Sequence, residues 1–228
     1  MKFKGVIFDL DGTLVNSLED IADAMNTVLQ GLNYPMHSYE TYQYFIGSGL
    51  RNLVNRSLPE TNNDEKHIDL CYQLMIEEYS HNCTRKTKAY DGIIELLDHL
   101  ISNNIKLSVF SNKSDALTKK ITADLFPGYF DTVVGLSVEA LKKPNPTEAI
   151  AISKKMGLEA EEIIFAGDSD IDMQTAVNAS MSAVGVTWGY RLEEELIAAG
   201  AKYIINSPLD LIKIIQPNDE TILAQNMW

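Results

Sequence analysis

Short runs of apolar and β-branched residues alternate with amphipathic helical segments along most of this chain, which is the pattern of a parallel α/β sheet. Two of the helical segments, residues 147–156 and 170–179, are long enough to cross between parallel strands. The predicted strands are residues 6–8, 105–110, 132–134, 162–166, 183–187 and 203–205. The first prediction is therefore an α/β fold built on a parallel sheet.

The alternation fails between residues 17 and 88, where only helical periodicity is found. The first segment of this region places its apolar residues on one helical face, at Ile21, Met25, Val28, Leu29 and Leu32. The Asp91-Gly92 pair then predicts a turn, after which residues 93–101 form a helix with a buried apolar face. We therefore predict a helical domain inserted after the first strand. The predicted domains are a helical one of residues 16–88 and a core of residues 1–15 and 89–228.

Two carboxylates follow the first strand directly, in the run Asp9-Leu10-Asp11-Gly12-Thr13. The strand before them is fully apolar, as expected of a strand buried on both faces, and Gly12 lets the chain turn sharply. In an open parallel sheet, ligands bind outside the carboxyl ends of the strands, so Asp9 and Asp11 occupy a site position. The alternative interpretation is an Asp-Gly turn with two solvated acids.

A second acidic cluster, with Asp168, Asp170 and Asp172, follows the predicted strand at residues 162–166 and opens a helix. Taken alone, it is explained equally well by an N-cap acid and first-turn aspartates that complement the helix dipole. If both clusters meet at one edge, two charges about 4 Å apart repel by about 4 kcal/mol at an effective dielectric of about 20, and a cation must lie among them. Mg²⁺ prefers such oxygen ligands, and neither cluster contains the His typical of zinc sites.

A hydroxyl and an amine complete the set of candidate site residues. Ser111 follows the predicted strand at residues 105–110, and Lys143 precedes a proline-stiffened turn that leads into a helix. Together with free backbone N–H groups, these side chains would make a cradle for a phosphoryl group. The alternative interpretations are a serine that only caps a helix and a lysine on the solvated surface.

The charge, the apolar runs and the cysteine content of the chain exclude several classes of protein. The formal charge of −13 excludes a basic nucleic-acid binder, and no apolar run approaches the roughly 20 residues that cross a bilayer. Asp9 interrupts the N-terminal segment before the apolar region of a signal peptide can form, so we expect a cytoplasmic protein without nucleic-acid or membrane partners. Cys71 and Cys83 make no CxxC pair or disulfide framework and are expected to be small, reduced apolar filler. The polar segment after Pro217 is expected to be an ordinary frayed terminus.

In this order, the four motifs resemble those of the haloacid dehalogenase-like hydrolase superfamily, which are DxDGT, a strand-end Ser or Thr, a Lys before a Pro-x-Pro turn, and GDxxxD. They match residues 9–13, Ser111, Lys143 and residues 168–172, and the resemblance covers nearly the whole chain. It implies a Rossmann-like core, a helical cap formed by the inserted domain, and Mg²⁺ as the cofactor. A small-molecule phosphate is the implied substrate.

The resemblance also implies a role for each matching residue. Asp9 would attack phosphorus to give an aspartyl-phosphate, and Asp11 would protonate the leaving oxygen and then deprotonate water. Mg²⁺ would be held by Asp9, the backbone carbonyl of Asp11, and Asp168. Asp172 would support the waters of the metal, or Lys143, without binding the ion directly. The residues implied to bind the phosphoryl group are Ser111, its neighbour Asn112, and Lys143.

Within the superfamily, residues 45–51 resemble the cap loop of phosphoglycolate phosphatases, and residues 186–191 resemble the stretch after their last motif. Gly47 would let this loop approach the site closely. Arg51 either offsets a carboxylate of the substrate or lies on a solvated helix face. Small anionic phosphates are therefore favoured. Asn16 departs from the Asp that these phosphatases often have in the hinge before the cap.

Several alternatives remain open at this point. Within the superfamily they are an inorganic pyrophosphatase, a sugar-phosphate phosphatase and a phosphoglucomutase, although residues 17–32 lack the His that mutases carry in the first cap helix. Dehalogenases have no acid at the position of Asp11, which disfavours dehalogenation. From other classes, a phospho-receiver switch and an inactive acidic binding domain are possible, although a receiver is about one ordinary domain long and lacks a cap. The oligomeric state is left open.

Overall fold

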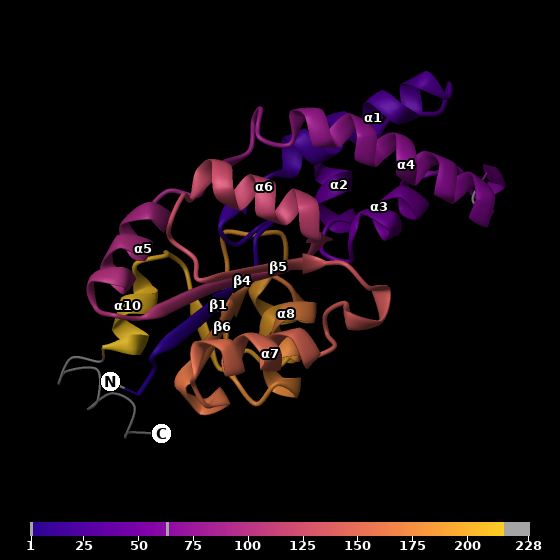
Figure 1. Ribbon diagram of the computed structural model, residues 1–228. Helices are drawn as coiled ribbons and strands as arrows, with labels where there is room; N and C mark the ends of the chain where they lie inside the picture. The colour runs from indigo at the N-terminus through magenta and orange to yellow at the C-terminus, as the bar shows by residue number, and fades with distance from the viewer. Residues whose placement is uncertain (1, 63, 217–228) are drawn as a thin grey trace.

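In the part of the chain that the structure describes, six parallel strands form one central sheet in the order β5-β4-β1-β6-β7-β8. The computed structural model describes residues 2–62 and 64–216. β1 (Gly5–Phe8) pairs in parallel with β4 (Lys106–Ser114) on one side and with β6 (Ile163–Gly167) on the other (Figure 1). The remaining strands of this sheet are β5 (Thr132–Leu136), β7 (Ser182–Val186) and β8 (Tyr203–Ile205). The predicted α/β class is confirmed, and the first strand of the sequence lies inside the sheet.

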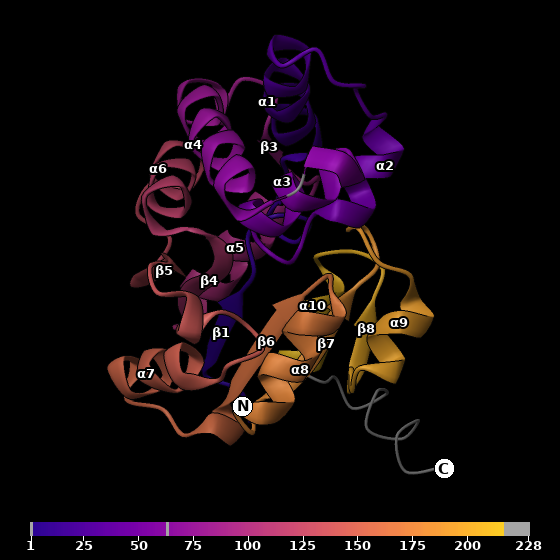
Figure 2. The ribbon, with the colours of Figure 1, turned by 90° about the vertical axis from the view of Figure 1, so that its right-hand side faces the viewer.

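Helices cover both faces of this sheet (Figures 1 and 2). Val6 and Phe8 of β1 point into one core, and Ile7 points into a second core on the opposite face, with all three at most 2% exposed. Against the sheet, the helices of the first core are α5 (Ile93–Ser102), α6 (Asp115–Leu125) and α10 (Asp210–Ile215), and the same core continues into the helical insertion. The helices of the second core are α7 (Thr147–Met156), α8 (Asp170–Asn178) and α9 (Glu193–Ala198). Burial on both faces explains why β1 is an unbroken apolar run.

A helical insertion follows the first strand, as the sequence predicts. Its helices are α1 (Leu18–Gly31), α2 (Tyr39–Phe45), α3 (Leu50–Ser57) and α4 (Glu65–Asn82). The apolar face predicted for the first helix is buried, with Ile21, Met25 and Leu29 at most 1% exposed. α1 packs along α4, and the insertion lies beyond the carboxyl ends of the strands (Figure 2).

Two short strands connect the insertion to the sheet. β2 (Val15–Asn16) and β3 (Lys88–Ala89) pair in antiparallel fashion, and the predicted domain boundaries fall inside this ribbon. The buried carboxylate of Asp20 in α1 holds the chain that approaches β3. It accepts from the backbone N–H of Lys86 at 2.9 Å, and from the N–H and hydroxyl of Thr87, both at 2.7 Å. α1 is therefore fixed to residues 86–87, through which the chain returns from the insertion to β3.

β4 is longer than predicted. It continues to Ser114 instead of ending at residue 110, because the backbone stays extended while the pairing with β5 shifts register between Phe110 and Ser114. α6 begins at Asp115 directly afterwards. Ser111 therefore lies within the strand, and the interpretation of Ser111 as a helix cap is wrong.

The remaining features concern single segments. Short 3₁₀ turns lie at Glu60–Asn62, Glu139–Leu141 and Ala160–Glu162. Cys71 and Cys83 are buried free thiols, as expected of apolar filler. Within the described ranges, no helix combines the length and the apolar character needed to cross a bilayer. Residues 217–228, predicted to be a frayed terminus, lie outside the described residues.

Candidate active site

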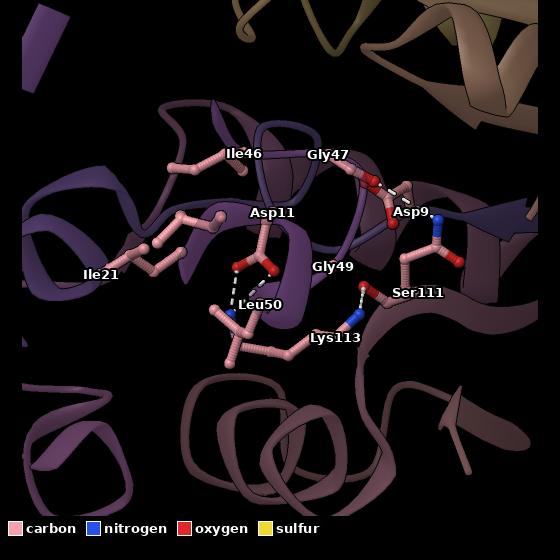
Figure 3. A pocket seen from close by; sticks show the side chains of 11 residues that line it. Asp9, Asp11, Ile21, Ile46, Gly47, Gly49, Leu50, Ser111 and Lys113 are labelled. Atoms are coloured by element: carbon pink, nitrogen blue, oxygen red, sulfur yellow. Dashed lines mark hydrogen bonds and ion pairs between the residues drawn. The ribbon is translucent and has the colours of Figure 1, made fainter. Parts of the chain in front are cut away.

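A pocket lies where the carboxyl ends of β1 and β4 meet the helical insertion (Figure 3). The residues that line it come from these strand ends, from α1 and α3, and from the segment between α2 and α3. They are Asp9, Asp11, Ile21, Ile46, Gly47, Gly49, Leu50, Leu53, Ser111, Asn112 and Lys113. The two acids after the first strand and the predicted hydroxyl therefore line one cavity together with apolar residues of the insertion.

Lys143 joins the two acidic clusters. Its Nζ lies 2.7 Å from Oδ1 of Asp9 and 2.6 Å from Oδ1 of Asp172, and all three side chains are at most 9% exposed. Burial alone lowers the pKa of a lysine, but the attraction of Asp172 and Asp9 outweighs it, so the pKa of Lys143 is raised. This lysine is a buried cation inside the site, and its interpretation as a solvated surface residue is wrong.

The turn before α8 holds Asp172 in place. Oδ2 of Asp172 accepts from the backbone N–H and the hydroxyl of Ser169 at 3.1 and 2.6 Å, while Oδ1 accepts from Lys143. Ser169 caps α8 by accepting from the N–H of Asp172. The cap of this helix is therefore a serine and not an aspartate. Asp172 closes the capping box and orients the buried lysine at the same time.

Asp168 lies beside Asp9 and Asp172, and one oxygen of each carboxylate is within 4.8 Å of the others. Its Oδ1 accepts from the hydroxyl of Thr13 at 3.2 Å, and its Oδ2 accepts from the backbone N–H of Tyr190 at 2.8 Å. Burial, with repulsion from Asp172 and Asp9, raises the pKa of Asp168 well above its ordinary value. Burial also raises the pKa of Asp9 to about 7, although the ammonium group of Lys143 lowers it.

These three carboxylates fit a divalent cation. They are oxygen donors of the kind that Mg²⁺ binds, and the single ammonium group of Lys143 does not balance three buried negative charges. Two glycines make room for the carboxylate of Asp168. A Cβ added at Gly12 would lie 2.3 Å from an atom of Asp168, and a Cβ added at Gly189 would lie 2.2 Å from one. The backbone is therefore shaped to hold this acid close to the end of β1.

Asp11 is held by a lysine that the sequence analysis did not assign to the site. Nζ of Lys113 lies 2.8 Å from both carboxylate oxygens of Asp11 (Figure 3), and the hydroxyl of Ser17 donates to Oδ1 at 2.5 Å. The Lys113 side chain is 1% exposed, and its ammonium lies 4.7 Å from the centre of the Tyr79 ring on α4. The sequence indicates this role only through position, because Lys113 lies two residues after Ser111 on a strand that ends at the predicted site.

Ser111 and Asn112 differ in what their side chains contact. Ser111 is buried, and its Oγ accepts from the backbone N–H of Lys113 at 3.2 Å at the edge of the pocket. Asn112 accepts from the N–H of Lys143 at 2.8 Å through Oδ1, and its Nδ2 donates to the carbonyls of Lys143 at 3.4 Å and of Gly47 at 3.3 Å. The Asn112 amide thus bridges three segments around the pocket, and its contact with a phosphoryl group stays a prediction.

Arg51 does not line the pocket. It lies on α3, where its guanidinium pairs with Glu65 at 2.5 Å and with Asp69 at 2.6 Å, and its side chain is 38% exposed. The buried residues of the same helix include Leu50 and Leu53, which do line the pocket. The structure therefore brings Gly47 to the site and places Arg51 on the outer side of α3, and the substrate contact predicted for Arg51 stays untested.

The chain matches known proteins over most of its length. The family model described as haloacid dehalogenase-like hydrolase matches residues 6–186, a range that includes every site residue described so far except Tyr190 and Gly189. Phosphoglycolate phosphatase of Aquifex aeolicus is 32% identical over 212 residues, which are 92% of this chain and 95% of that protein. Phosphoglycolate phosphatase of Nitrosospira multiformis is 32% identical over 221 residues, which are 95% and 97% of the two chains.

Among solved structures, a predicted phosphoglycolate phosphatase from Haemophilus somnus superposes on this chain with a TM-score of 0.85 at 28% identity. The superposition covers 95% of this chain and 99% of that one. The helical insertion is therefore included in the similarity, together with the sheet.

Proposed function

This chain belongs to the haloacid dehalogenase-like hydrolases, and on that premise we propose that it is a Mg²⁺-dependent phosphatase for a small phosphate monoester, with 2-phosphoglycolate as the preferred substrate. The observation that carries the proposal is the convergence of Asp9, Lys143 and Asp168 in one buried cluster. Such a cluster offers a nucleophile, a cation and metal ligands to one phosphoryl group. The relatives named phosphoglycolate phosphatase support the choice of substrate.

The first step transfers the phosphoryl group to the protein. Oδ1 of Asp9 accepts from Lys143, and Oδ2 attacks phosphorus while the bond from phosphorus to the ester oxygen breaks. Asp11 gives its proton to the leaving oxygen, so the alcohol departs neutral. Lys143 and Ser111 donate to the equatorial phosphoryl oxygens as charge develops on them.

The second step releases phosphate. Asp11, now a carboxylate, takes a proton from a water molecule, and the water oxygen attacks phosphorus. The bond between phosphorus and Oδ2 of Asp9 breaks, which restores the Asp9 carboxylate and liberates inorganic phosphate. The ammonium of Lys113 is bonded to both oxygens of Asp11 in this structure and holds the side chain in the pocket. While Asp11 carries its proton, only its unprotonated oxygen accepts from Lys113.

Asp9, Asp168 and the backbone carbonyl of Asp11 are the groups that would hold Mg²⁺, with Asp172 supporting the arrangement through Lys143. When bound, Mg²⁺ supplies the positive charge that lets a carboxylate approach a phosphate dianion.

The helical insertion, residues 16–88, acts in this proposal as a cap that selects the substrate. It presents Gly47 and Gly49 next to the catalytic acids, together with apolar side chains such as Ile46 and Leu50. Because neither glycine has a side chain, the backbone of the cap can lie close to the catalytic acids. The space left for the substrate is then small, which favours a small phosphate over a large one.

A substrate comparison tests the proposal. We expect kcat/KM for 2-phosphoglycolate to exceed that for pyrophosphate, glucose 1-phosphate and AMP by at least about tenfold, equivalent to about 1.4 kcal/mol in the transition state. Chelation by EDTA is expected to stop turnover, and added Mg²⁺ to restore it. A preference for pyrophosphate would favour the inorganic pyrophosphatase alternative, and a preference for a sugar phosphate would favour the sugar-phosphate phosphatase or phosphoglucomutase alternatives.

The same assay separates the enzyme from the other two classes. A phospho-receiver switch would take up one phosphoryl group per chain and stop, and an inactive binding domain would release no phosphate at all. Repeated turnover with release of inorganic phosphate is the result we expect.

Replacing Lys113 with methionine tests the role given to Asp11. We expect the rate of phosphoryl transfer from 2-phosphoglycolate, measured in a single turnover, to fall by roughly 10- to 100-fold, because general acid catalysis contributes about 10²- to 10⁴-fold. The transfer from acetyl phosphate, a substrate of similar size whose leaving group needs no proton, is expected to change by less than about threefold.

The matched control is Lys119→Met. Lys119 is 58% exposed on α6 and pairs only with Asp115 among the described residues, at 2.6 Å, so its loss should leave both transfers unchanged. An equal loss with both substrates in Lys113→Met would show that Lys113 does not act through the proton of Asp11.

A further inference from the structure

The loop between β7 and α9 contacts the site and the helical insertion at the same time. On the site side, the backbone N–H of Tyr190 donates to Asp168, and the indole N–H of Trp188 donates to the carbonyl of Thr13 at 3.0 Å. Asp168 and Thr13 belong to the two acidic motifs, so the loop lies firmly against the catalytic centre. Arg191 follows directly and points the other way, towards the insertion.

The guanidinium of Arg191 donates to two backbone carbonyls of the insertion. Nη1 lies 3.0 Å from the carbonyl oxygen of Gln43, and Nη2 lies 2.7 Å from that of Ile46. Both carbonyls are at the C-terminal end of α2, where they lack partners within the helix and where the helix dipole favours a cation. The planar guanidinium can reach both at once, whereas a lysine would have a single donor atom.

Holding Ile46 also fixes the part of the cap that lines the pocket. Gly47 follows Ile46 directly and has a φ of +112°, so the chain turns sharply here towards the catalytic acids. On the other side, Asn112 of β4 donates to the carbonyl of Gly47. Segment 46–49 is therefore bonded to the core at two places, through Arg191 after β7 and through Asn112 on β4.

We propose that Arg191 is a positioning residue that holds segment 46–49 over the pocket, and so sets the affinity for a small substrate, by bonding the carbonyls of Gln43 and Ile46. The proposal rests on the proposed function where it concerns substrate affinity, and on geometry alone where it concerns the segment. Because the same loop binds Asp168 through its backbone, the cap is aligned directly against the metal-ligand acids.

The chain offers a closely matched control. Arg56 on α3 also donates to a carbonyl at the end of α2, that of Tyr44, at 2.7 Å, and its guanidinium lies 4.7 Å from the centre of the Phe45 ring. Arg56 and Tyr44 both belong to the insertion, so this bond stabilises the end of α2 without connecting it to the core. Replacing Arg56 therefore removes the same kind of interaction without releasing the cap.

The experiment compares Arg191→Ala, Arg191→Lys and Arg56→Ala by hydrogen exchange and by steady-state kinetics. In Arg191→Ala we expect amide exchange across residues 39–53 to accelerate by at least about tenfold, and KM for 2-phosphoglycolate to rise by at least about tenfold with kcat within about threefold. Arg191→Lys is expected to be intermediate. Arg56→Ala is expected to keep KM within about threefold of the wild type.

Two results would overturn the proposal: unchanged exchange across residues 39–53 in both Arg191 variants, or a rise in KM in Arg56→Ala equal to that in Arg191→Ala. If the alanine variant does not fold, the lysine variant carries the same comparison. If the wild type does not hydrolyse 2-phosphoglycolate at all, the proposed function fails, while the exchange measurement still decides whether Arg191 holds the segment.

Discussion

Replacing Asp9 with asparagine is expected to lower kcat/KM for 2-phosphoglycolate by roughly 10⁴-fold or more, the scale seen when an enzyme loses its nucleophile. The amide oxygen of asparagine keeps the shape of the side chain and can still accept from Lys143, but it does not attack phosphorus. The variant should therefore bind substrate and fail to form the aspartyl-phosphate. Phosphate release measured against an EDTA blank checks this result.

The loss in Asp9→Asn should not come from unfolding. Asp9 lies with Asp168 and Asp172 in a cluster of buried carboxylates, in which Asp9 and Asp172 pair with the ammonium of Lys143. A neutral residue in place of Asp9 reduces the repulsion among them. We expect the urea midpoint of the variant in EDTA to be no lower than that of the wild type. Asp170→Asn is the control, because Asp170 belongs to the second acidic motif but contacts only Gln174 among the hydrogen bonds of the described residues. Activity of Asp9→Asn close to that of Asp170→Asn would contradict the mechanism.

Local pattern was sufficient to predict two of the strands that bear the site, β1 and β6. β1 and β6 are buried on both faces, so each is a short apolar run, and the acids that follow them stand out as the first charged residues after the run. The same holds for α7, which has the predicted bounds because Gly157, at φ +65°, ends the helix. In these places sequence neighbours determine the structure, and prediction needs little else.

Contacts between distant segments could not be predicted in this way. Lys113 and Asp11 are 102 residues apart, and Arg191 and Gln43 are 148 residues apart. Nothing in the residues around a lysine or an arginine indicates which distant carboxylate or carbonyl it will reach, because that depends on how the strands are ordered and how the insertion folds back over the sheet. Every residue has a backbone carbonyl, so the sequence does not show which carbonyl accepts from a distant side chain.

The position of Arg51 is an intermediate case. The buried face of α3 contains Leu50, Leu53 and Val54, and a residue one position after Leu50 lies about 100° around the helix from it. Helical periodicity alone therefore favours the outer face, where the structure places it. The resemblance of residues 45–51 to the cap loop of phosphoglycolate phosphatases left a substrate contact for Arg51 open, because it applied to the segment as a whole and not to individual side chains.

Replacing Lys143 with methionine is expected to destabilise the protein in EDTA by about 3–5 kcal/mol, because removing one partner of a buried ion pair leaves uncompensated charge. Here the variant would keep Asp9, Asp168 and Asp172 buried within reach of one another without the ammonium between them. We also expect kcat/KM to fall by roughly 10³-fold, since the cation that faces the phosphoryl group is lost. Urea unfolding and steady-state kinetics measure the two effects.

The adjacent residue provides the control for Lys143→Met. Lys142 pairs with Glu139 at 2.9 Å near the surface, and its side chain is 22% exposed, so Lys142→Met is expected to change the free energy of unfolding by less than about 1 kcal/mol. Equal urea midpoints for the two variants would mean that Lys143 does not neutralise the buried acids. Added Mg²⁺ is expected to raise the midpoint of Lys143→Met more than that of the wild type, because the variant holds one more unbalanced negative charge.

A double substitution separates the effect of Lys143 on stability from its effect on catalysis. In Lys143→Met with Asp172→Asn, the uncharged amide can still accept from Ser169, so the turn before α8 keeps its cap while one repelling charge is gone. We expect much of the lost stability to return, because the two positions form one interacting pair and their effects are not additive. Activity should stay low, because no substitution at residue 172 restores a cation next to the phosphoryl group. Recovery of both properties together would mean that Lys143 serves the fold alone.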